Sequence, residues 1–225
     1  MMELREFIRA VRSAGGPQAV LPVVVMMGAI GGIAALQGVT IMRMFGVERL
    51  LAGMLTEVTL RDLAPTMTAL MLAAQVGTAM AGEIGAMRVT EESDALRVMG
   101  VDPWKFLAVP RIAALTLMTP VVAGLGGAAA LAAGYAGAVF THGASAGPFI
   151  ASLADQVSVG GVLEGAWKAA VFGFLCAVVA CKHGMAARGG SEGVGRAVNA
   201  AIVQSIILIG CAEAVLTALL MRVIG

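Results

Sequence analysis

The sequence predicts an all-α polytopic integral membrane protein of about five transmembrane helices, with a short helix before the first and another in a loop. Of its 225 residues, 59% are hydrophobic and 13% are charged, and the mean hydropathy is +0.92. Soluble domains carry roughly 25% charged residues, so this chain has too little polar surface to cover a globule in water. A water-soluble enzyme is all but excluded, and the net charge of +1 gives no general attraction to nucleic acid.

Apolar stretches long enough to cross a bilayer define the expected transmembrane helices. About 20 apolar residues are needed to span the hydrocarbon core. Five stretches are predicted to do so: residues 19–42, 63–82, 112–141, 159–181 and 197–221. The first three contain no charged residue, whereas the fourth contains Glu164 and Lys168 and the fifth contains Glu213.

Residues 1–14 are expected to form an interfacial helix on the cytoplasmic leaflet. Apolar and basic side chains fall on different helical faces: Leu4, Phe7, Ile8 and Val11 against Arg5, Arg9 and Arg12. No long apolar core and no small-residue cleavage site follow, so the segment does not resemble a secretory signal peptide. A frayed basic tail is the alternative.

The distribution of lysine and arginine predicts the orientation. Ten lie in the N-terminal segment and the loops after the second and fourth stretches: Arg5, Arg9, Arg12, Arg88, Arg97, Lys105, Arg111, Lys182, Arg188 and Arg196. Four lie on the other side: Arg43, Arg49, Arg61 and Arg222. Because positively charged loops stay in the cytoplasm, the N-terminus is expected there and the C-terminus outside.

The most informative loop follows the second stretch and predicts a short helix over residues 90–100. Thr90 is expected to cap its N-terminus, and Gly100 to supply a left-handed C-terminal stop. Asp102 and Pro103 are expected to start the next helix. The first turn carries three acidic residues, Glu91, Glu92 and Asp94.

A helix set crosswise between two transmembrane helices is suited to docking in a groove of a cytoplasmic partner. Leu96 and Met99 share one face, whereas Glu92 and Arg97 point elsewhere. Glu83 is expected to bond to this segment or to Arg88. The candidate docking residues are Glu83, Arg88, Glu91, Glu92, Asp94 and Arg97. The alternative is an ordinary solvated connector.

Charges within the membrane form a second candidate site. Such charges are costly and usually face a cavity or a partner. Glu164 and Lys168 lie four residues apart and therefore share a helix face. With Glu213 they either line the outer mouth of a lipid cavity or form a structural ion pair between the fourth and fifth helices.

Small residues indicate close packing between helices. Gly28 and Gly32 are spaced four apart in the first stretch. The third carries a longer stripe of small residues: Gly126, Ala130, Gly134 and Ala138.

Two segments closely resemble the signature of the MlaE (YrbE) permease family. They are residues 83–103, followed by Pro110 and Arg111, and residues 189–198. Further matches lie in the family's fourth span: Lys168, Phe172, Gly173, Cys181 and Gly184. The chain departs from the family in the stretch Gln75-Val76-Gly77. The family commonly has Arg before this glycine, whereas this chain has Gln75, so no role of that cation is carried over.

The resemblance implies a permease subunit of an ABC-type lipid transporter, working as a pair of permeases, with a second copy of this chain as the expected partner. Two cytoplasmic ATPases would dock on the pair and hold ATP and magnesium, so no cofactor is expected on this chain. A periplasmic ring of MCE-domain protein and a small accessory regulator of the ATPase complete the implied partners. The cargo would be phospholipid, the location the cell inner membrane with a periplasmic C-terminus, and residues 90–100 the coupling helix.

The sequence carries no catalytic pattern of its own. It lacks the GxxxxGK[ST] phosphate loop of an ATPase, a Ser/His/Asp set and a metal-ligand motif. An ion-gradient-driven secondary transporter or channel is the alternative, but it predicts an inverted repeat, and five spans do not divide into equal halves. A structural membrane anchor is a third possibility.

Overall fold

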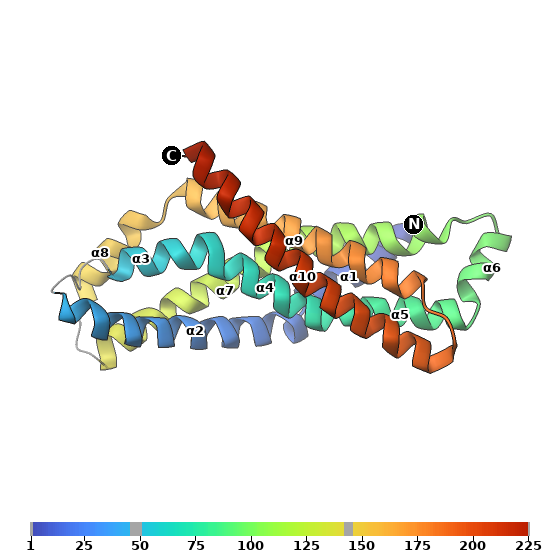
Figure 1. Cartoon of the computed structure of the whole chain (residues 1–225), viewed down its shortest axis with the longest axis horizontal. Coiled ribbons are helices and arrows are strands. Elements are labelled where there is room, and N and C mark those ends of the chain that lie inside the picture. The colour runs from blue at the N-terminus through green and yellow to red at the C-terminus, as the bar shows by residue number, and fades with distance from the viewer. Residues whose placement is uncertain (1, 46–50, 142–145, 225) are drawn as a thin grey trace.

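The computed structural model describes residues 2–45, 51–141 and 146–224, and those residues form helices and connecting turns with no strand. Met1 and Arg49 lie outside the described residues. Five long apolar rods make up the molecule: Glu6–Met42, Ala52–Val89, Trp104–Thr141, Val159–Met185 and Gly190–Leu220. The last of them crosses the others obliquely (Figure 1). Each is long and apolar enough to cross a membrane, which confirms the predicted fold class.

The rods are assembled from shorter helical elements. The first two rods comprise α1 (Met2–Gly15), α2 (Pro17–Met44), α3 (Leu51–Val58), η2 (Thr59–Leu63), α4 (Ala64–Leu72), η3 (Ala73–Gly77) and α5 (Thr78–Val89). The others comprise η4 (Trp104–Ala108), α7 (Val109–Ala136), η5 (Gly137–Thr141), α9 (Val159–Met185) and α10 (Gly190–Ile224). The four elements labelled η are π-helical turns, which occur often at functional sites.

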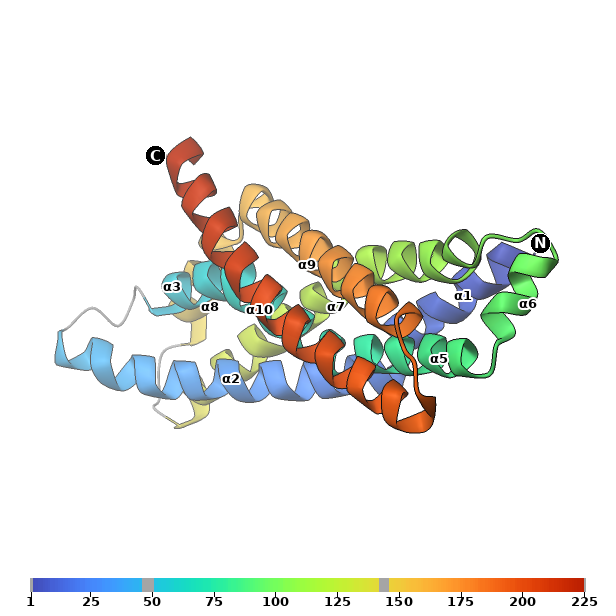
Figure 2. The ribbon, with the colours of Figure 1, turned by 45° about the vertical axis from the view of Figure 1, so that its right-hand side comes forward.

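The second and third rods are longer than a bilayer is thick. Each has 38 residues, or about 57 Å at 1.5 Å per residue, against a hydrocarbon core of about 30 Å. Both therefore project beyond the core. The short helix α6 (Glu92–Val98) joins their projecting ends and lies far from α8 (Ala146–Gln156), at the opposite end (Figures 1 and 2).

The small-residue stripe of the third rod packs inside the subunit, against α2. Gly126, Ala130, Gly134 and Ala138 are all buried. The closest approach is at Gly31, where a Cβ atom would lie 2.2 Å from the backbone oxygen of Ala130. The predicted pair Gly28 and Gly32 faces the same helix at an ordinary 3.8 to 3.9 Å. The sequence thus identified two helix faces that pack closely, but neither their partner nor the tightest contact.

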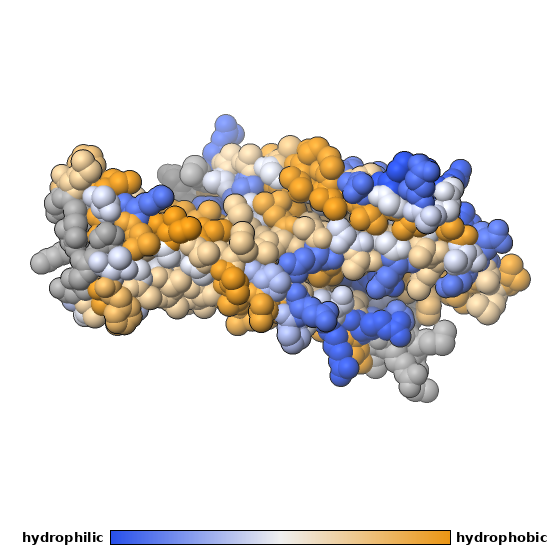
Figure 3. Space-filling view, turned by 90° about the horizontal axis from the view of Figure 1, so that it is seen from below, coloured by the Kyte–Doolittle hydropathy of each residue, from blue (hydrophilic) through white to orange (hydrophobic). Residues whose placement is uncertain are grey.

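The helix α1 packs against α7 and buries Ala14. It lies beside α5 at the α6 end of the molecule (Figure 2). On the outer surface, apolar side chains extend over much of the bundle, and hydrophilic ones concentrate on the half that carries α6 (Figure 3). This arrangement is the one expected for rods that are embedded at one end and project into water at the other.

Candidate functional site

Lys168 lies at the centre of a cluster of polar side chains between the second, fourth and fifth rods. It lies on α9 and has no exposed surface. Its Nζ atom is 2.5 Å from Oδ1 of Asp62 and donates a 2.9 Å hydrogen bond to Oγ1 of Thr217. Oε1 of Glu213 is 3.4 Å from the same Nζ atom. Because a buried ammonium requires charged partners, two acidic residues from two other helices are held against α9.

The approach of η2 to α9 depends on Gly165. A Cβ atom at this position would lie 2.1 Å from the backbone oxygen of Leu60, so only glycine permits the contact. Gly165 precedes Lys168 by about one turn and lies on the same side of α9. The π-helical turn of η2 inserts an extra residue into its helix and so redirects the side chains that follow. Together these features bring Asp62 to Lys168.

Glu213 is fixed by hydroxyl groups at both carboxylate oxygens. Thr66 donates a hydrogen bond of 2.8 Å to Oε2, and Thr217 donates one of 3.1 Å to Oε1. The bond from Thr66 joins α10 to α4, whereas the contacts of Lys168 with Glu213 and Thr217 join α10 to α9. We refer to Asp62, Thr66, Lys168, Glu213 and Thr217 as the Lys168 cluster.

Glu164 does not pair with Lys168, although the two lie four residues apart on α9. Its Oε2 atom is instead 3.6 Å from Nε of Arg61, and Nη1 of Arg61 donates a 2.7 Å hydrogen bond to Glu57. From the sequence, Arg61 was expected in the loop before the second stretch, which was predicted to begin at residue 63. Arg61 instead lies within a continuous helical rod, together with Asp62. Hydropathy missed them because it detects only the apolar part of that rod.

The three charged residues predicted within the membrane, Glu164, Lys168 and Glu213, therefore do not form one accessible site. Lys168 is inaccessible, whereas Arg61 is partly exposed and lines a polar pocket with Glu57, Asp155 and Ser158. For Lys168 this geometry favours the structural alternative, an ion-paired tie between helices. Arg61, which the sequence analysis did not select, is better placed to contact a ligand.

At the C-terminal end of the α6 segment, the structure has the capping features that the sequence predicts. Gly100 is left-handed, with φ of +77°, and donates a 3.0 Å hydrogen bond to the carbonyl of Arg97. The N–H of Val101 bonds to the carbonyl of Leu96 at 3.0 Å, which completes a Schellman motif. Asp102 accepts a 3.0 Å hydrogen bond from the N–H of Trp104 and so caps the next helical segment, as predicted.

The predicted N-cap was wrong by one residue. Glu91 occupies that position in a left-handed conformation, with φ of +62° and no side-chain cap. Thr90 instead ends α5, where its hydroxyl donates a 3.1 Å hydrogen bond to the carbonyl of Ala86. It also bonds to the carboxylate of Glu92 at 3.2 Å. Thr90 therefore closes the preceding helix, because its N–H also bonds to the carbonyl of Ala86, at 2.9 Å.

Arg88 anchors α6 to the end of α5. Its Nη1 atom is 2.5 Å from Oδ1 of Asp94 and 3.1 Å from Oγ of Ser93, which is buried. Asp94 also lies 3.6 Å from Arg97. Contrary to the predicted pairings, Glu83 contacts Arg111 at the start of α7, at 2.9 Å, rather than Arg88 or α6. These ion pairs fix the direction in which α6 projects.

Two apolar side chains protrude from the C-terminal end of α6. Val98 is 89% exposed and Met99 is 68% exposed. Leu96 instead turns toward the bundle and lines a groove with Met87 and Phe106. Since exposed apolar residues at a projecting tip lose contact with water when a partner covers them, this end of α6 is suited to docking.

Within the described ranges, no three His, Cys, Asp or Glu side chains come close enough together to hold a metal ion. The Lys168 cluster consists of a cation and its counter-ions, and its hydroxyl groups are already engaged.

Comparison with known proteins agrees with this arrangement of helices. The family model described as Permease MlaE matches residues 7–219. A probable ABC transporter permease protein of Synechocystis is 32% identical over 194 residues, which cover 86% of this chain and 74% of that protein. A probable ABC transporter permease protein of Rickettsia typhi is 33% identical over 204 residues, which cover 90% and 79% of the two chains.

A plant protein is similar over a smaller part of its length. The Arabidopsis thaliana chloroplast protein TRIGALACTOSYLDIACYLGLYCEROL 1 is 30% identical over 185 residues, which cover 76% of this chain and 49% of that protein. The family match extends over nearly the whole chain and includes every long rod. This protein therefore belongs to the MlaE family of ABC transporter permeases.

Proposed function

We propose that this chain is the membrane permease subunit of an ABC lipid transporter. In this proposal it moves phospholipid between the inner membrane and a periplasmic MCE-domain protein, using ATP that a partner subunit hydrolyses. The observation that carries the proposal is α6, a helix with a Schellman C-cap and an exposed apolar end that joins two rods projecting beyond a bilayer. Such a helix can receive a push from a cytoplasmic ATPase and pass it to both rods.

The assignment of a lipid cargo rests on chemistry and on one relative. The chloroplast relative bears the name of a diacylglycerol lipid. The long rods expose large apolar residues along their length, including Leu21 on α2, Leu117 on α7 and Ile207 on α10. An acyl chain needs only such an uncharged surface, whereas an ion or a sugar needs polar ligands throughout its path.

We assign the binding positions of the other subunits from the two ends of the molecule and from α10. The excess of basic residues at the α6 end supports a cytoplasmic location for that end and for the N-terminus. ATP and magnesium would be held by a dimer of ATPases there, with an accessory regulator bound to it. The C-terminus and α8 would face the MCE ring. The sparsely buried α10 supports contact with a second copy of this chain.

Purification from native membranes in mild detergent tests the whole assembly. We expect a P-loop ATPase, an MCE protein and phospholipid to elute with the chain, and we expect reconstituted vesicles to require ATP for lipid transfer. Lipid transfer driven by an ion gradient without any ATPase would instead support the secondary transporter. A chain that binds the MCE protein but stimulates no ATPase would be the structural anchor.

The double variant V98E/M99E is expected to lower ATPase stimulation by the permease at least tenfold. It places two charges where apolar side chains would be buried by the partner, at a cost of a few kcal/mol, and each 1.4 kcal/mol corresponds to about tenfold in affinity. The measurement is ATP hydrolysis by the reconstituted complex, together with recovery of the ATPase on the immobilised permease.

The matched control is V159E, at the opposite end of the bundle. Val159 is 83% exposed, so the same change is made in an equally open setting. ATPase recovery should be unaffected by this control. Equal recovery with V98E/M99E and with V159E would mean that the ATPase does not dock on the end of α6.

A further inference from the structure

The two helices on either side of α6 are packed into different parts of the bundle. The preceding helix, α5, packs against α9 and α10, whereas the following helix, α7, packs against α1, α2 and α9. Few backbone contacts join α5 directly to α7. Because both helices contact α9, the bundle joins them indirectly, and a direct tie between α5 and α7 would make them respond together to a push on α6.

One ion pair between described residues makes this tie. Oε2 of Glu83 on α5 lies 2.9 Å from Nη1 of Arg111 on α7. The two ends differ in environment: the Arg111 side chain is 5% exposed, whereas that of Glu83 is 60% exposed. The contact is an ion pair without hydrogen-bond alignment, because the buried Nη1 atom has no hydrogen-bond partner among the described residues.

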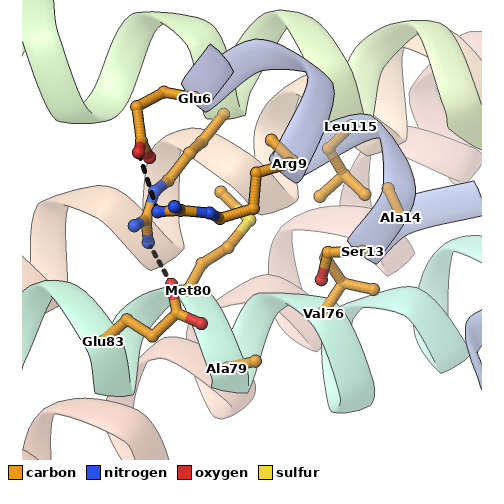
Figure 4. Close-up of a pocket in the computed structure, with 11 residues that line it drawn as sticks. Glu6, Arg9, Ser13, Ala14, Val76, Ala79, Met80, Glu83 and Leu115 are labelled. Carbon is orange, nitrogen blue, oxygen red and sulfur yellow. Dashed lines mark hydrogen bonds and ion pairs between the residues drawn. The ribbon is translucent and has the colours of Figure 1, made fainter. Parts of the chain in front are cut away.

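The helix α1 covers this pair. Glu6, Arg9 and Ser13 line a small pocket together with Glu83 and Arg111, and Figure 4 shows the first three descending from α1 toward α5. Arg9 is engaged by Glu6 at 2.8 Å. Arg111 is therefore enclosed by α1, α5 and α7, at the level where α5 and α7 leave the bundle toward α6.

We infer that Arg111 is a positioning residue that makes α5 and α7 move as one unit when α6 is displaced. The inference rests on the proposed function of α6. The displacement of α6 enters α5 through Arg88 and Asp94 and enters α7 through the capped turn at Asp102. The ion pair between Glu83 and Arg111 connects α5 and α7 a second time, farther from α6, and keeps these two helices at a fixed separation.

A stability role alone does not account for the pair. A buried guanidinium with an unsatisfied nitrogen costs free energy, and replacing buried ionic groups by apolar side chains of similar size is often neutral or stabilising. Glu83 would lose only a partner, since its carboxylate already faces water. Thermal stability and the transmission of movement should therefore respond differently to the loss of Arg111.

The test is Arg111→Met in the reconstituted complex with its ATPase, measured as lipid molecules transferred per ATP hydrolysed. We expect this ratio to fall by about fivefold, while the unfolding temperature of the permease remains within about 2 °C of the wild type or rises. Arg9→Met is the matched control. Its side chain is 73% exposed in the same pocket, and the ratio should not change.

A double-mutant cycle identifies the partner. Glu83→Gln should lower the ratio to a similar extent, and the double variant should be no worse than either single variant, because both changes remove one contact. An unchanged ratio in Arg111→Met, or additive losses, would overturn the inference. A drop in unfolding temperature matching the loss of transfer would assign Arg111 a structural role only. If the wild-type chain itself couples no ATP hydrolysis to transfer, the proposed function fails instead.

Discussion

Replacing Lys168 with methionine should destabilise the permease by about 3 kcal/mol, since removing one partner of a buried ion pair leaves uncompensated charge. Asp62 and Glu213 would both lose the ammonium that neutralises them. For a chain of this size the loss corresponds to a fall of about 10 °C in unfolding temperature. Fluorescence-detected unfolding of the purified protein in detergent measures it directly.

Two further variants show whether the effect comes from unpaired charge. Lys182→Met lies on the same helix but at an exposed position, and it should leave the unfolding temperature unchanged. Adding Asp62→Asn and Glu213→Gln to Lys168→Met removes all three charges and should recover most of the lost stability. Failure of the triple variant to recover would mean that Lys168 stabilises the bundle through packing rather than charge.

Gly31→Ala should destabilise the contact between α2 and α7 by about 2 to 3 kcal/mol, the usual cost of overpacking a close contact. The new Cβ atom would lie 2.2 Å from the backbone oxygen of Ala130, and a backbone atom cannot move aside as a flexible side chain can. The two helices would have to separate along the whole small-residue stripe. The measurement is again the unfolding temperature.

Gly28→Ala is the matched control, because it lies one turn earlier on the same helix. Its Cβ atom would lie 3.9 Å from the nearest atoms of α7, an ordinary van der Waals distance. This variant should be as stable as the wild type or slightly more so, since alanine favours helix over glycine. Equal stability of Gly31→Ala and Gly28→Ala would contradict the close approach of the two helices at Gly31.

Local signals in the sequence were sufficient for the C-terminal end of α6 and for the start of the next helix. Gly100, Asp102 and Pro103 stop one helix and start the next through their own backbone preferences, so their roles do not depend on distant residues. The N-cap was misplaced at Thr90 because Glu91 adopts a left-handed conformation that its residue type does not favour. The turn between α5 and α6 decides that conformation.

Partners of charged residues could be predicted only in part. Glu213 was one of the two expected partners of Lys168 and lies 3.4 Å from it, whereas the pair of Glu164 and Lys168 does not form. Glu164 contacts Arg61 instead, and Lys168 also contacts Asp62, each about a hundred positions earlier in the chain. Similarly, Glu83 was expected to bond within its own loop and instead pairs with Arg111. Spacing along a helix indicates which residues share a face. Only the packing of the helices determines which residues of other helices that face contacts.

The sequence by itself determined the membrane class, the five long helices and the exposed helix between the second and third. These follow from composition, from hydrophobic length and from local capping, each of which acts over a few turns of one helix. The tertiary structure alone decided that Asp62 pairs with Lys168, that Gly31 sets the closest helix contact and that Arg111 joins α5 to α7. These pairings depend on the rotation and register of whole rods, which many weak contacts set together.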